Sequence, residues 1–299
     1  MSSPKSLTEL PVNKQFFVGI DSDGCVFDTM GIKQRECFCP LMIGHFRLQP
    51  VAEAARECKE FADLFSKTRG ANRHVTMVRI LDELLHTHPM VKERNFQVPR
   101  LPHYTAWVKN PDSLLSDKGL EQAFSGAASE EARKELQLVL HWSKRVNVLV
   151  EEIIFNIPPF PYVRESLEKI KASADMIVCS QTPTEALNRE WEEHGISEYP
   201  HIIAGQELGT KAEHLRLATA GKYAPGNVLM MGDAPGDYAA AKANNAHFFP
   251  INPGHETASW KRFCEEGFDK FIQGEFAGAY QEALLDEFNA CLPEVPPWI

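Results

Sequence analysis

Short apolar runs alternate with amphipathic stretches over the second half of the chain. Four of the runs are bounded by polar residues and have the length of buried strands: 175–180, 201–204, 227–231 and 247–250. Four stretches beside them place apolar residues at the three- and four-residue spacing of helices: 162–171, 183–193, 211–220 and 238–244. Strands and helices that alternate in this way predict a parallel sheet with helices on its faces.

The first half of the chain has a different pattern. Residues 15–21 form one more short apolar run, but only helical patterns and loops follow it. The helical patterns occupy four stretches: 51–65, 74–86, 129–141 and 146–155. Prolines and irregular spacing over residues 89–115 predict loops there. Prolines at positions 158, 159 and 161 then end the helical region, because proline stops a helix and stiffens the chain.

These patterns predict an α/β fold with a Rossmann-like, doubly wound parallel sheet and an inserted α-helical cap. We expect a discontinuous core of residues 1–29 and 159–255, with the cap at 30–158. Residues 256–299 are amphipathic and predict a helical extension that packs on the core. The aromatic residues of this extension suit a surface that faces the core better than a binding groove.

Composition and charge narrow the choice of partners. With 43% hydrophobic and 24% charged residues, the 299-residue chain has the balance of a globular protein with a sizeable core. Its formal net charge of -10 disfavours nucleic acid and anionic membranes, which attract clustered Lys and Arg. No run approaches the ~20 apolar residues that cross a bilayer, and residues 1–14 lack a signal-peptide core. The seven cysteines are scattered without zinc-site spacing, so we expect reduced thiols in a cytoplasmic protein.

Two carboxylates follow the first predicted strand. Asp21 and Asp23 lie two residues apart at the strand end, and Gly24 allows the backbone to turn sharply after them. A carboxylate can attack phosphorus as a nucleophile, and a second carboxylic acid can protonate the leaving oxygen. An ordinary Asp/Gly turn after a strand accounts for this segment equally well.

Two later segments offer groups that suit a phosphate. Ser180 ends a predicted strand directly before a helix, where a hydroxyl and backbone N–H groups can hold a phosphate. An N-cap for that helix is the simpler reading of Ser180. Lys211, in the first turn of the next helix, can neutralise charge near a phosphoryl group, although a solvated lysine explains it too.

A second pair of acids follows the strand predicted at 227–231. Asp233 and Asp237 are joined by a tight turn, and magnesium is held in proteins by a few carboxylates together with water and phosphate oxygens. Asp237 also suits the role of a helix cap. All four segments would lie at the carboxyl ends of parallel strands, which is where open α/β sheets bind ligands.

In this order, Asp-x-Asp, a strand-end Ser, Lys and Gly-Asp-x-x-x-Asp resemble the haloacid dehalogenase-like superfamily. The resemblance covers residues 16–250 and is closest to the aspartate-nucleophile phosphatases with a helical cap, which include phosphoglycolate phosphatases and beta-phosphoglucomutases. It lies in the motifs and the position of the cap rather than in similarity throughout. Cys25, Val26 and Gln181 differ from the residues frequent at their positions, but none removes a group that the mechanism needs.

The resemblance implies a role for each motif residue. Asp21 would be the nucleophile and Asp23 the general acid/base. Both would also bind magnesium, Asp23 through its backbone carbonyl. Ser180 would hold the phosphoryl group, and Lys211 would steady the Asp21 carboxylate. A further two acids complete the implied metal site: Asp233 as a ligand, and Asp237 as a ligand or as a residue that orients one.

The second acid separates the chemistries found on this scaffold. The resemblance implies that dehalogenases lack the acid at position 23 and that phosphonatase-like members replace it, so Asp23 disfavours both. We therefore expect a magnesium-dependent phosphohydrolase that cleaves a small phosphate monoester through an aspartyl-phosphate. A phosphomutase that acts on a sugar phosphate keeps the same motifs and remains open. So does a phosphometabolite-binding protein with weak catalysis.

Substrate choice is expected in the cap, which would close over the site. The densest basic cluster of the cap contains Arg69, Arg73 and His74, and Gly70 would let a loop present them to an anionic substrate. A solvated loop is an equal alternative. Gln181, next to Ser180, completes the residues expected to bind the substrate. The expected partner is a small phosphorylated metabolite, whose identity the sequence does not specify, and the sequence predicts no oligomeric state.

Overall fold

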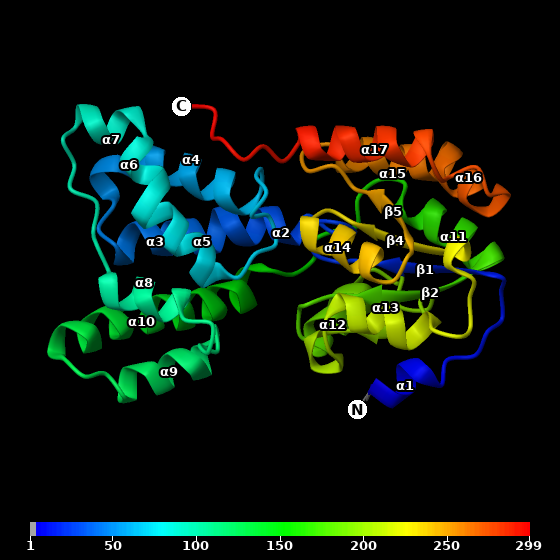
Figure 1. Ribbon diagram of the computed structural model, residues 1–299, viewed down its shortest axis with the longest axis horizontal. Helices are drawn as coiled ribbons and strands as arrows, with labels where there is room; N and C mark the ends of the chain where they lie inside the picture. The colour runs from blue at the N-terminus through cyan, green and yellow to red at the C-terminus, as the bar shows by residue number, and fades with distance from the viewer. Residues whose placement is uncertain (1–3) are drawn as a thin grey trace. The chain divides into compact units, whose positions relative to one another are not determined.

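The computed structural model describes residues 4–299, and these form an α/β fold with a helical insertion. Five strands in the described part of the chain form one parallel sheet with the order β3-β2-β1-β4-β5 (Figure 1). Their bounds are β1 (Phe16–Ile20), β2 (Ala174–Cys179), β3 (Ile203–Ala204), β4 (Val228–Gly232) and β5 (His247–Pro250). The predicted α/β fold is confirmed, and each predicted strand exists within a few residues of its expected bounds.

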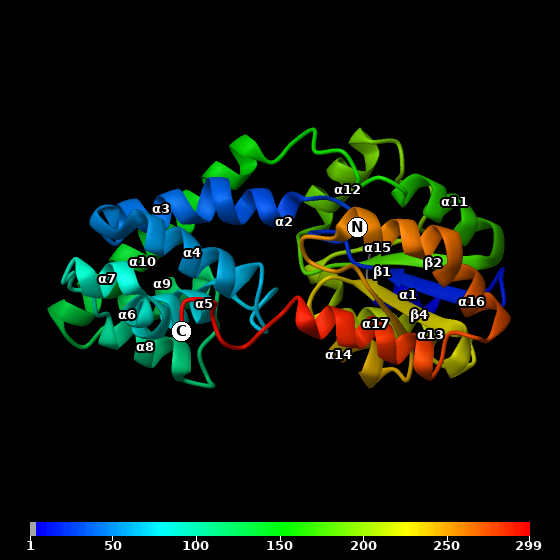
Figure 2. The same cartoon turned by 90° about the horizontal axis from the view of Figure 1, so that it is seen from above.

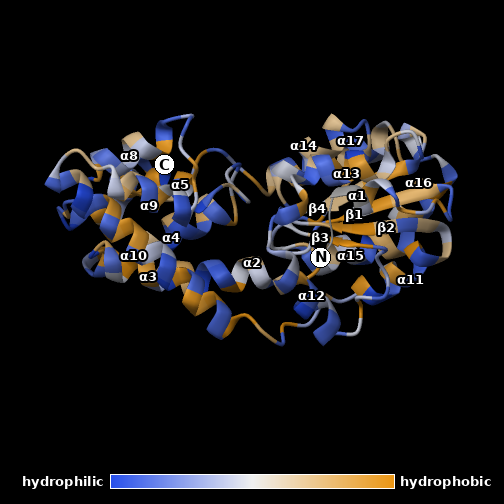
Figure 3. Ribbon diagram, turned by 90° about the horizontal axis from the view of Figure 1, so that it is seen from below, coloured by the Kyte–Doolittle hydropathy of each residue, from blue (hydrophilic) through white to orange (hydrophobic). Residues whose placement is uncertain are grey.

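The strands are apolar throughout because helices cover both faces of the sheet, as Figure 2 shows. Val18 and Ile20 of β1 point into one buried cluster, whereas Phe17 points into the other. The same alternation continues along β4, where Leu229 and Val228 lie on opposite faces. Figure 3 shows the resulting contrast between apolar strands and polar helix surfaces.

Clustering of contacts divides the chain into two compact units. The core unit comprises Met1–Met30 and Asn156–Leu292, and the cap unit comprises Gly31–Phe155 and Pro293–Ile299. The chain therefore passes between the units three times, after residues 30, 155 and 292. The last seven residues, which the sequence had placed in an extension on the core, belong to the cap unit.

The helices of the core unit follow the predicted pattern, except that Pro183 lies before its helix and not within the first turn. They are α1 (Pro4–Thr8), α11 (Val163–Ser173), α12 (Thr184–Glu193), η4 (Gln206–Leu208), α13 (Lys211–Thr219), η5 (Pro225–Asn227), α14 (Pro235–Ala243), α15 (Glu256–Arg262), η6 (Phe263–Gly267), α16 (Phe268–Gln273) and α17 (Ala279–Ala290). Pro183 precedes α12 as its N-cap with extended backbone, not as a first-turn residue. The aromatic residues of the extension face the core as expected, and Trp260, Phe263 and Phe268 are almost fully buried.

The cap unit is helical throughout. Its elements are α2 (Thr29–Ile32), η1 (Lys33–Phe38), α3 (Cys39–His45), η2 (Gln49–Val51), α4 (Ala52–Asp63), α5 (Arg73–Arg79), η3 (Ile80–Leu84), α6 (Leu85–Thr87), α7 (Pro89–Glu93), α8 (Pro102–Lys109), α9 (Asp117–Ser125) and α10 (Glu130–Ile153), with α2 beginning in the core unit. No helix in the described part of the chain is long and apolar enough to span a membrane.

Two sequence predictions for the cap were wrong. The region predicted as loops over residues 89–115 contains α7 and α8, because Pro89 and Pro102 take the first helical position, where proline costs no hydrogen bond. The two helices predicted at 129–141 and 146–155 are one helix, α10, which Ser129 caps through the N–H of Ala132.

Candidate functional site

The three acidic or hydroxyl segments meet at one edge of the sheet. Asp21 follows β1, Ser180 follows β2, and Asp233 follows β4 directly after its last residue, Gly232. Since β1 pairs in parallel with both β2 and β4, the carboxyl ends of these strands are neighbours. The sequence prediction that these segments share one edge follows directly from this topology.

A lysine links two of the acids. The Lys211 ammonium lies 2.8 Å from Oδ2 of Asp21 and 2.6 Å from Oδ1 of Asp237. Lys211 is the first residue of α13, where Thr210 and Glu213 form a reciprocal capping box that fixes the start of the helix. The lysine is therefore held by the local structure of its helix as well as by the two carboxylates.

Asp237 is fixed from three sides. Its Oδ2 accepts hydrogen bonds from the backbone N–H groups of Asp233 and Ala234, at 3.1 and 3.0 Å. Asp237 lies in the first turn of α14, where backbone N–H groups attract an acid. A Cβ atom at position 232 would overlap the Asp237 carboxylate, so Gly232 is the residue that allows this close approach.

Burial gives these groups unusual ionisation. Burial raises the pKa of the Asp21 carboxyl well above its usual range; Lys211 opposes the shift, and the negative charges of Asp237 and Asp233 add to it. Burial acts to lower the pKa of Lys211, but attraction to Asp21 and Asp237 outweighs it and raises that pKa well above its usual range. The lysine therefore stays charged. A further cation near Asp21 would lower the pKa of the Asp21 carboxyl and favour its ionised form.

The acids form a cluster that can hold a metal ion. One carboxylate oxygen from each of Asp21, Asp233 and Asp237 lies within 4.8 Å of the others, and all three residues are buried. Oδ1 of Asp21 is buried and has no hydrogen-bond partner among residues 4–299. The Lys211 ammonium contacts the carboxylates of Asp21 and Asp237, and the Asp233 carboxylate lies beside them, so among these four groups negative charge is in excess. Carboxylate oxygens and this excess suit a hard divalent cation.

Asp23 is positioned by two hydroxyl groups that were not among the predicted site residues. Thr29, at the start of α2, donates to Oδ1 of Asp23, and Thr182 donates to Oδ2 at 2.8 Å. Asp23 does not join the cluster of side chains that can hold a metal. Both threonines lie in the segments that carry the motifs. Their closeness in sequence to the motif residues was the signal that the sequence offered.

Tryptophans hold the loop that carries Asp21 and Asp23. The loop makes one tight turn in which the N–H of Val26 donates to the carbonyl of Ser22, and Gly24 has a φ of 77°. Trp191 donates to the hydroxyl of Ser22 at 3.0 Å, and Trp260 of α15 donates to the carbonyl of Cys25 at 2.7 Å. The helical extension therefore supports the loop of the site.

Ser180 and Gln181 occupy the loop after β2. Ser180 is buried, and its Oγ accepts from the N–H of Thr182 at 3.2 Å. Gln181 is exposed, and its amide donates to the carbonyls of Ser180 and Gly209. Gln181 thereby joins this loop to the one that precedes Lys211. The predicted contacts of both residues with a substrate stay predictions.

The three cap residues expected to bind substrate are built into the cap. Arg69 is buried and donates to the carbonyl of Leu64. Arg73 donates to Ser143 and Asn147 of α10 and lies over the ring of Phe38.

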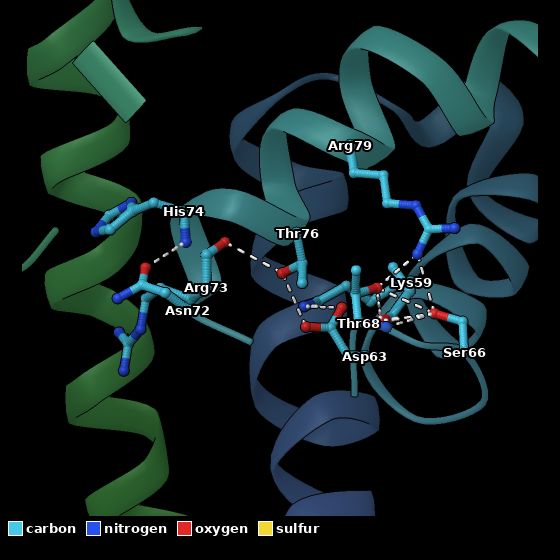
Figure 4. Close-up of polar contacts among 10 residues, drawn as sticks. Lys59, Asp63, Ser66, Thr68, Asn72, Arg73, His74, Thr76 and Arg79 are labelled. Carbon is cyan, nitrogen blue, oxygen red and sulfur yellow. Dashed lines mark hydrogen bonds and ion pairs between the residues drawn. The ribbon is translucent and has the colours of Figure 1, made fainter. Parts of the chain in front are cut away.

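His74 is also buried in the cap, with Nδ1 3.0 Å from the hydroxyl of Tyr104. Figure 4 shows Arg73 and His74 in the first turn of α5, directly after Asn72, the N-cap residue of this helix. They lie on a helix rather than on a loop, and their role in substrate binding stays a prediction.

Comparison with known proteins gives structural likeness only. No protein-family model matches the chain, and no curated protein matches it. A predicted phosphoglycolate phosphatase from Haemophilus somnus is similar to it, with 15% identity, coverage of 80% of this chain and 86% of that chain, and a TM-score of 0.46.

Two further solved structures are similar at the same level. A haloacid dehalogenase-like family hydrolase from Xanthomonas campestris has 10% identity, coverage of 88% and 97%, and a TM-score of 0.45. A candidate beta-phosphoglucomutase from Bacteroides vulgatus has 15% identity, coverage of 92% and 100%, and a TM-score of 0.42. Since likeness at this level does not identify an activity, the function is argued from the site itself.

Proposed function

We propose that this protein is a magnesium-dependent phosphohydrolase of the haloacid dehalogenase-like superfamily. It cleaves a small phosphate monoester through an aspartyl-phosphate on Asp21. The site residues and their order along the chain support this proposal, and the structural likeness is compatible with it.

One observation carries the proposal. Asp21 is a buried carboxylate with one oxygen on the Lys211 ammonium and the other without a hydrogen-bond partner in the described chain. A structural aspartate in such a place would have both oxygens satisfied, because an unpaired buried carboxylate oxygen is costly. The arrangement instead leaves one oxygen available to a ligand, as nucleophilic attack on phosphorus requires.

The residues of the site can carry out both the phosphoryl transfer and the proton transfers of this reaction. An oxygen of Asp21 attacks the phosphorus, the bond to the leaving oxygen breaks, and Asp23 gives that oxygen its proton. Asp23 then takes a proton from water, which attacks the aspartyl-phosphate and releases inorganic phosphate and the Asp21 carboxylate. Thr29 and Thr182 hold the two oxygens of Asp23, so the acid is positioned before substrate arrives.

Asp21 and Asp233 would hold the magnesium ion, and Asp237 would orient the site. Both oxygens of Asp237 already have partners, on Lys211 and on two backbone N–H groups, which favours this orienting role. When bound, the ion would neutralise negative charge on the transferring phosphoryl group. Lys211 steadies the Asp21 carboxylate in the same step, and Ser180 would hold a phosphoryl oxygen.

Phosphate release from a panel of phosphate monoesters tests the proposal. We expect release that requires magnesium, stops with a chelator and falls by at least about 10⁴-fold in Asp21→Asn, since the nucleophile is lost while the side chain keeps its shape. Chasing the phosphoenzyme with water or with a sugar phosphate separates hydrolysis from phosphoryl return to a sugar. The absence of phosphate release from every ester, at any magnesium concentration, would contradict the proposal.

A further inference from the structure

The end of the chain leaves the unit in which the preceding helix lies. Phe288 of α17 and the following Leu292 are buried in the core unit, against the face of the sheet that includes Phe17. Residues 293–295 are exposed, and from Pro293 onward the chain belongs to the cap unit. The last seven residues, 293–299, thus form a third passage of the chain between the units, and we call them the C-terminal leash.

The leash is attached to the cap by its penultimate residue. The indole N–H of Trp298 donates to the hydroxyl of Thr87 at 3.1 Å. The indole ring packs edge-on against Phe61 at 5.6 Å between centroids and lies 5.1 Å from the ring of His88. A tryptophan held by one hydrogen bond and two aromatic neighbours is a specific anchor, not a loose chain end.

A second attachment lies at the start of the leash. Arg79 donates through one nitrogen to the carbonyl of Glu294 at 3.1 Å. Through its other nitrogen it donates to the hydroxyls of Ser66 and Thr68, as Figure 4 shows, so the guanidinium is itself fixed in the cap. Pro296, between the two attachments, is buried. The leash is therefore attached to the cap near both of its ends, although most of its residues are exposed.

The two ends of this connection are close in sequence. Three residues, 293–295, lie between Leu292, buried in the core unit, and Pro296, buried in the cap unit, so the two are four positions apart. An extended chain covers at most about 3.6 Å per residue, so the two anchored residues cannot move more than about 14 Å apart while both stay docked. Any movement of the cap that needs a larger separation first requires release of the leash.

We infer that the C-terminal leash limits the opening of the cap and that release of Trp298 lets the cap open further. Without the leash, the chain itself would connect the cap unit with the core unit only after residues 30 and 155. The consequence for catalysis rests on the proposed function: a restrained cap spends more time in closed states, which favours substrate capture at low concentration.

Lengthening the leash without changing its anchors is the direct test. Twelve Gly-Ser residues inserted between Leu292 and Pro293 leave Trp298, Arg79 and their contacts intact. The exposed linker grows from three residues to fifteen. The effective concentration of one end of a linker at the other falls roughly as the −3/2 power of linker length. We therefore expect the ratio of open to closed cap to rise by up to about tenfold. Trp298→Ala should give the same direction of change, and Ile299→Ala, at a side chain that is 72% exposed, is the matched control.

Two readouts do not depend on activity. The first is the rate of chymotrypsin cleavage after Phe155, which is 61% exposed beside another passage between the units and yields fragments 1–155 and 156–299. The second is the maximum dimension from small-angle X-ray scattering. Faster cleavage and a larger dimension in the insertion variant would support the leash. An insertion variant equal to the native protein in both would overturn it, even if Trp298→Ala differs, because that change could then come only from lost packing.

Kinetics with an aryl phosphate supply the third readout. We expect KM to rise by up to about tenfold in the insertion variant while kcat does not fall, since the catalytic groups are untouched. If the native protein releases no phosphate, the proposed function fails, and the cleavage and scattering results still decide the leash.

Discussion

The core unit and the cap unit each bury a cluster of charged side chains, and the two clusters are balanced differently. In the core, one ammonium, on Lys211, faces the carboxylates of Asp21 and Asp237, with a third carboxylate beside them. In the cap, Lys59 and Asp63 form a single pair at 2.8 Å, and both are at least 96% buried. The second oxygen of Asp63 accepts from Thr76, so this cluster is satisfied from within (Figure 4).

The comparison shows that buried charge alone does not mark a functional site. Removing a charge from water is costly, so a purely structural cluster must supply its own compensation. The cap cluster does so, whereas the core cluster keeps excess negative charge and an Asp21 oxygen without a partner among residues 4–299. The imbalance, and not the number of charges, points to a ligand that comes from outside the chain.

The largest effect on stability is expected from breaking the balanced cluster. Lys59→Met leaves the Asp63 carboxylate buried without its cation, and we expect the free energy of unfolding to fall by about 3–5 kcal/mol in urea denaturation. Lys134→Met, which removes an exposed cap lysine 3.9 Å from Glu130, is the control and should change stability by less than about 0.5 kcal/mol. Equal losses in the two variants would show that the buried pair is not a structural cluster.

The pH dependence of the cap should show the next largest effect. Burial, assisted by the charge of Arg73 and opposed by Asp117, lowers the pKa of His74 from 6.5 to about 4. The unfolded chain therefore binds the proton more readily between these pH values, so stability is retained above pH 6.5 and falls as the pH drops toward 4. The loss should reach about 3 kcal/mol.

Unfolding of the native protein and of His74→Gln across this pH range checks the prediction. The variant should lose this part of the pH dependence, whereas His103→Gln, at an exposed histidine on the cap, should keep it. A native profile that is flat between pH 6.5 and 4 would contradict the burial argument.

Removing one acid from the unbalanced core cluster should not lower the stability of the metal-free protein, in contrast to the loss expected from breaking the cap cluster. Magnesium at about 100 times its Kd should stabilise the native protein by about 2.7 kcal/mol, and most of this gain should disappear in Asp233→Asn. Without magnesium, the variant should be no less stable than the native protein, because a negative charge that raises the pKa of Asp21 is gone. Thermal unfolding with and without magnesium measures both effects, with Asp286→Asn, an exposed acid of α17, as control. A destabilised metal-free variant would make the core cluster structural.

The smallest effect is expected from displacing one acid without changing its charge. In Gly232→Ala the new methyl group overlaps the Asp237 carboxylate, which must move away from Lys211. Magnesium affinity and phosphate release should each fall by about 10- to 100-fold. Gly236→Ala, on the same helix with open space around a new Cβ atom, should leave both unchanged. An active Gly232→Ala would show that the position of Asp237 is unimportant.

Most of the fold and the acids of the site could be predicted from the sequence. Short apolar runs reveal strands, alternation with helices requires a parallel sheet, and a parallel sheet brings the residues after its strands to one edge. For this reason Asp21, Ser180 and Asp233 could be placed together without coordinates. The loops predicted over residues 89–115 show the limit of this approach, since proline at a first helical position looks the same in sequence as proline in a loop.

Tertiary structure alone decided which polar groups satisfy one another. Trp260 supports the carbonyl of Cys25 across 235 positions of sequence, and Thr182 reaches Asp23 across 159. The basic cluster around Arg73 looked like a set of available cations, yet Arg73 donates to Ser143 and Asn147 of a distant helix. Sequence patterns record which residues are apolar and how they are spaced, because these properties are local. Compensation of a buried charge depends on partners that only the folded chain brings into contact.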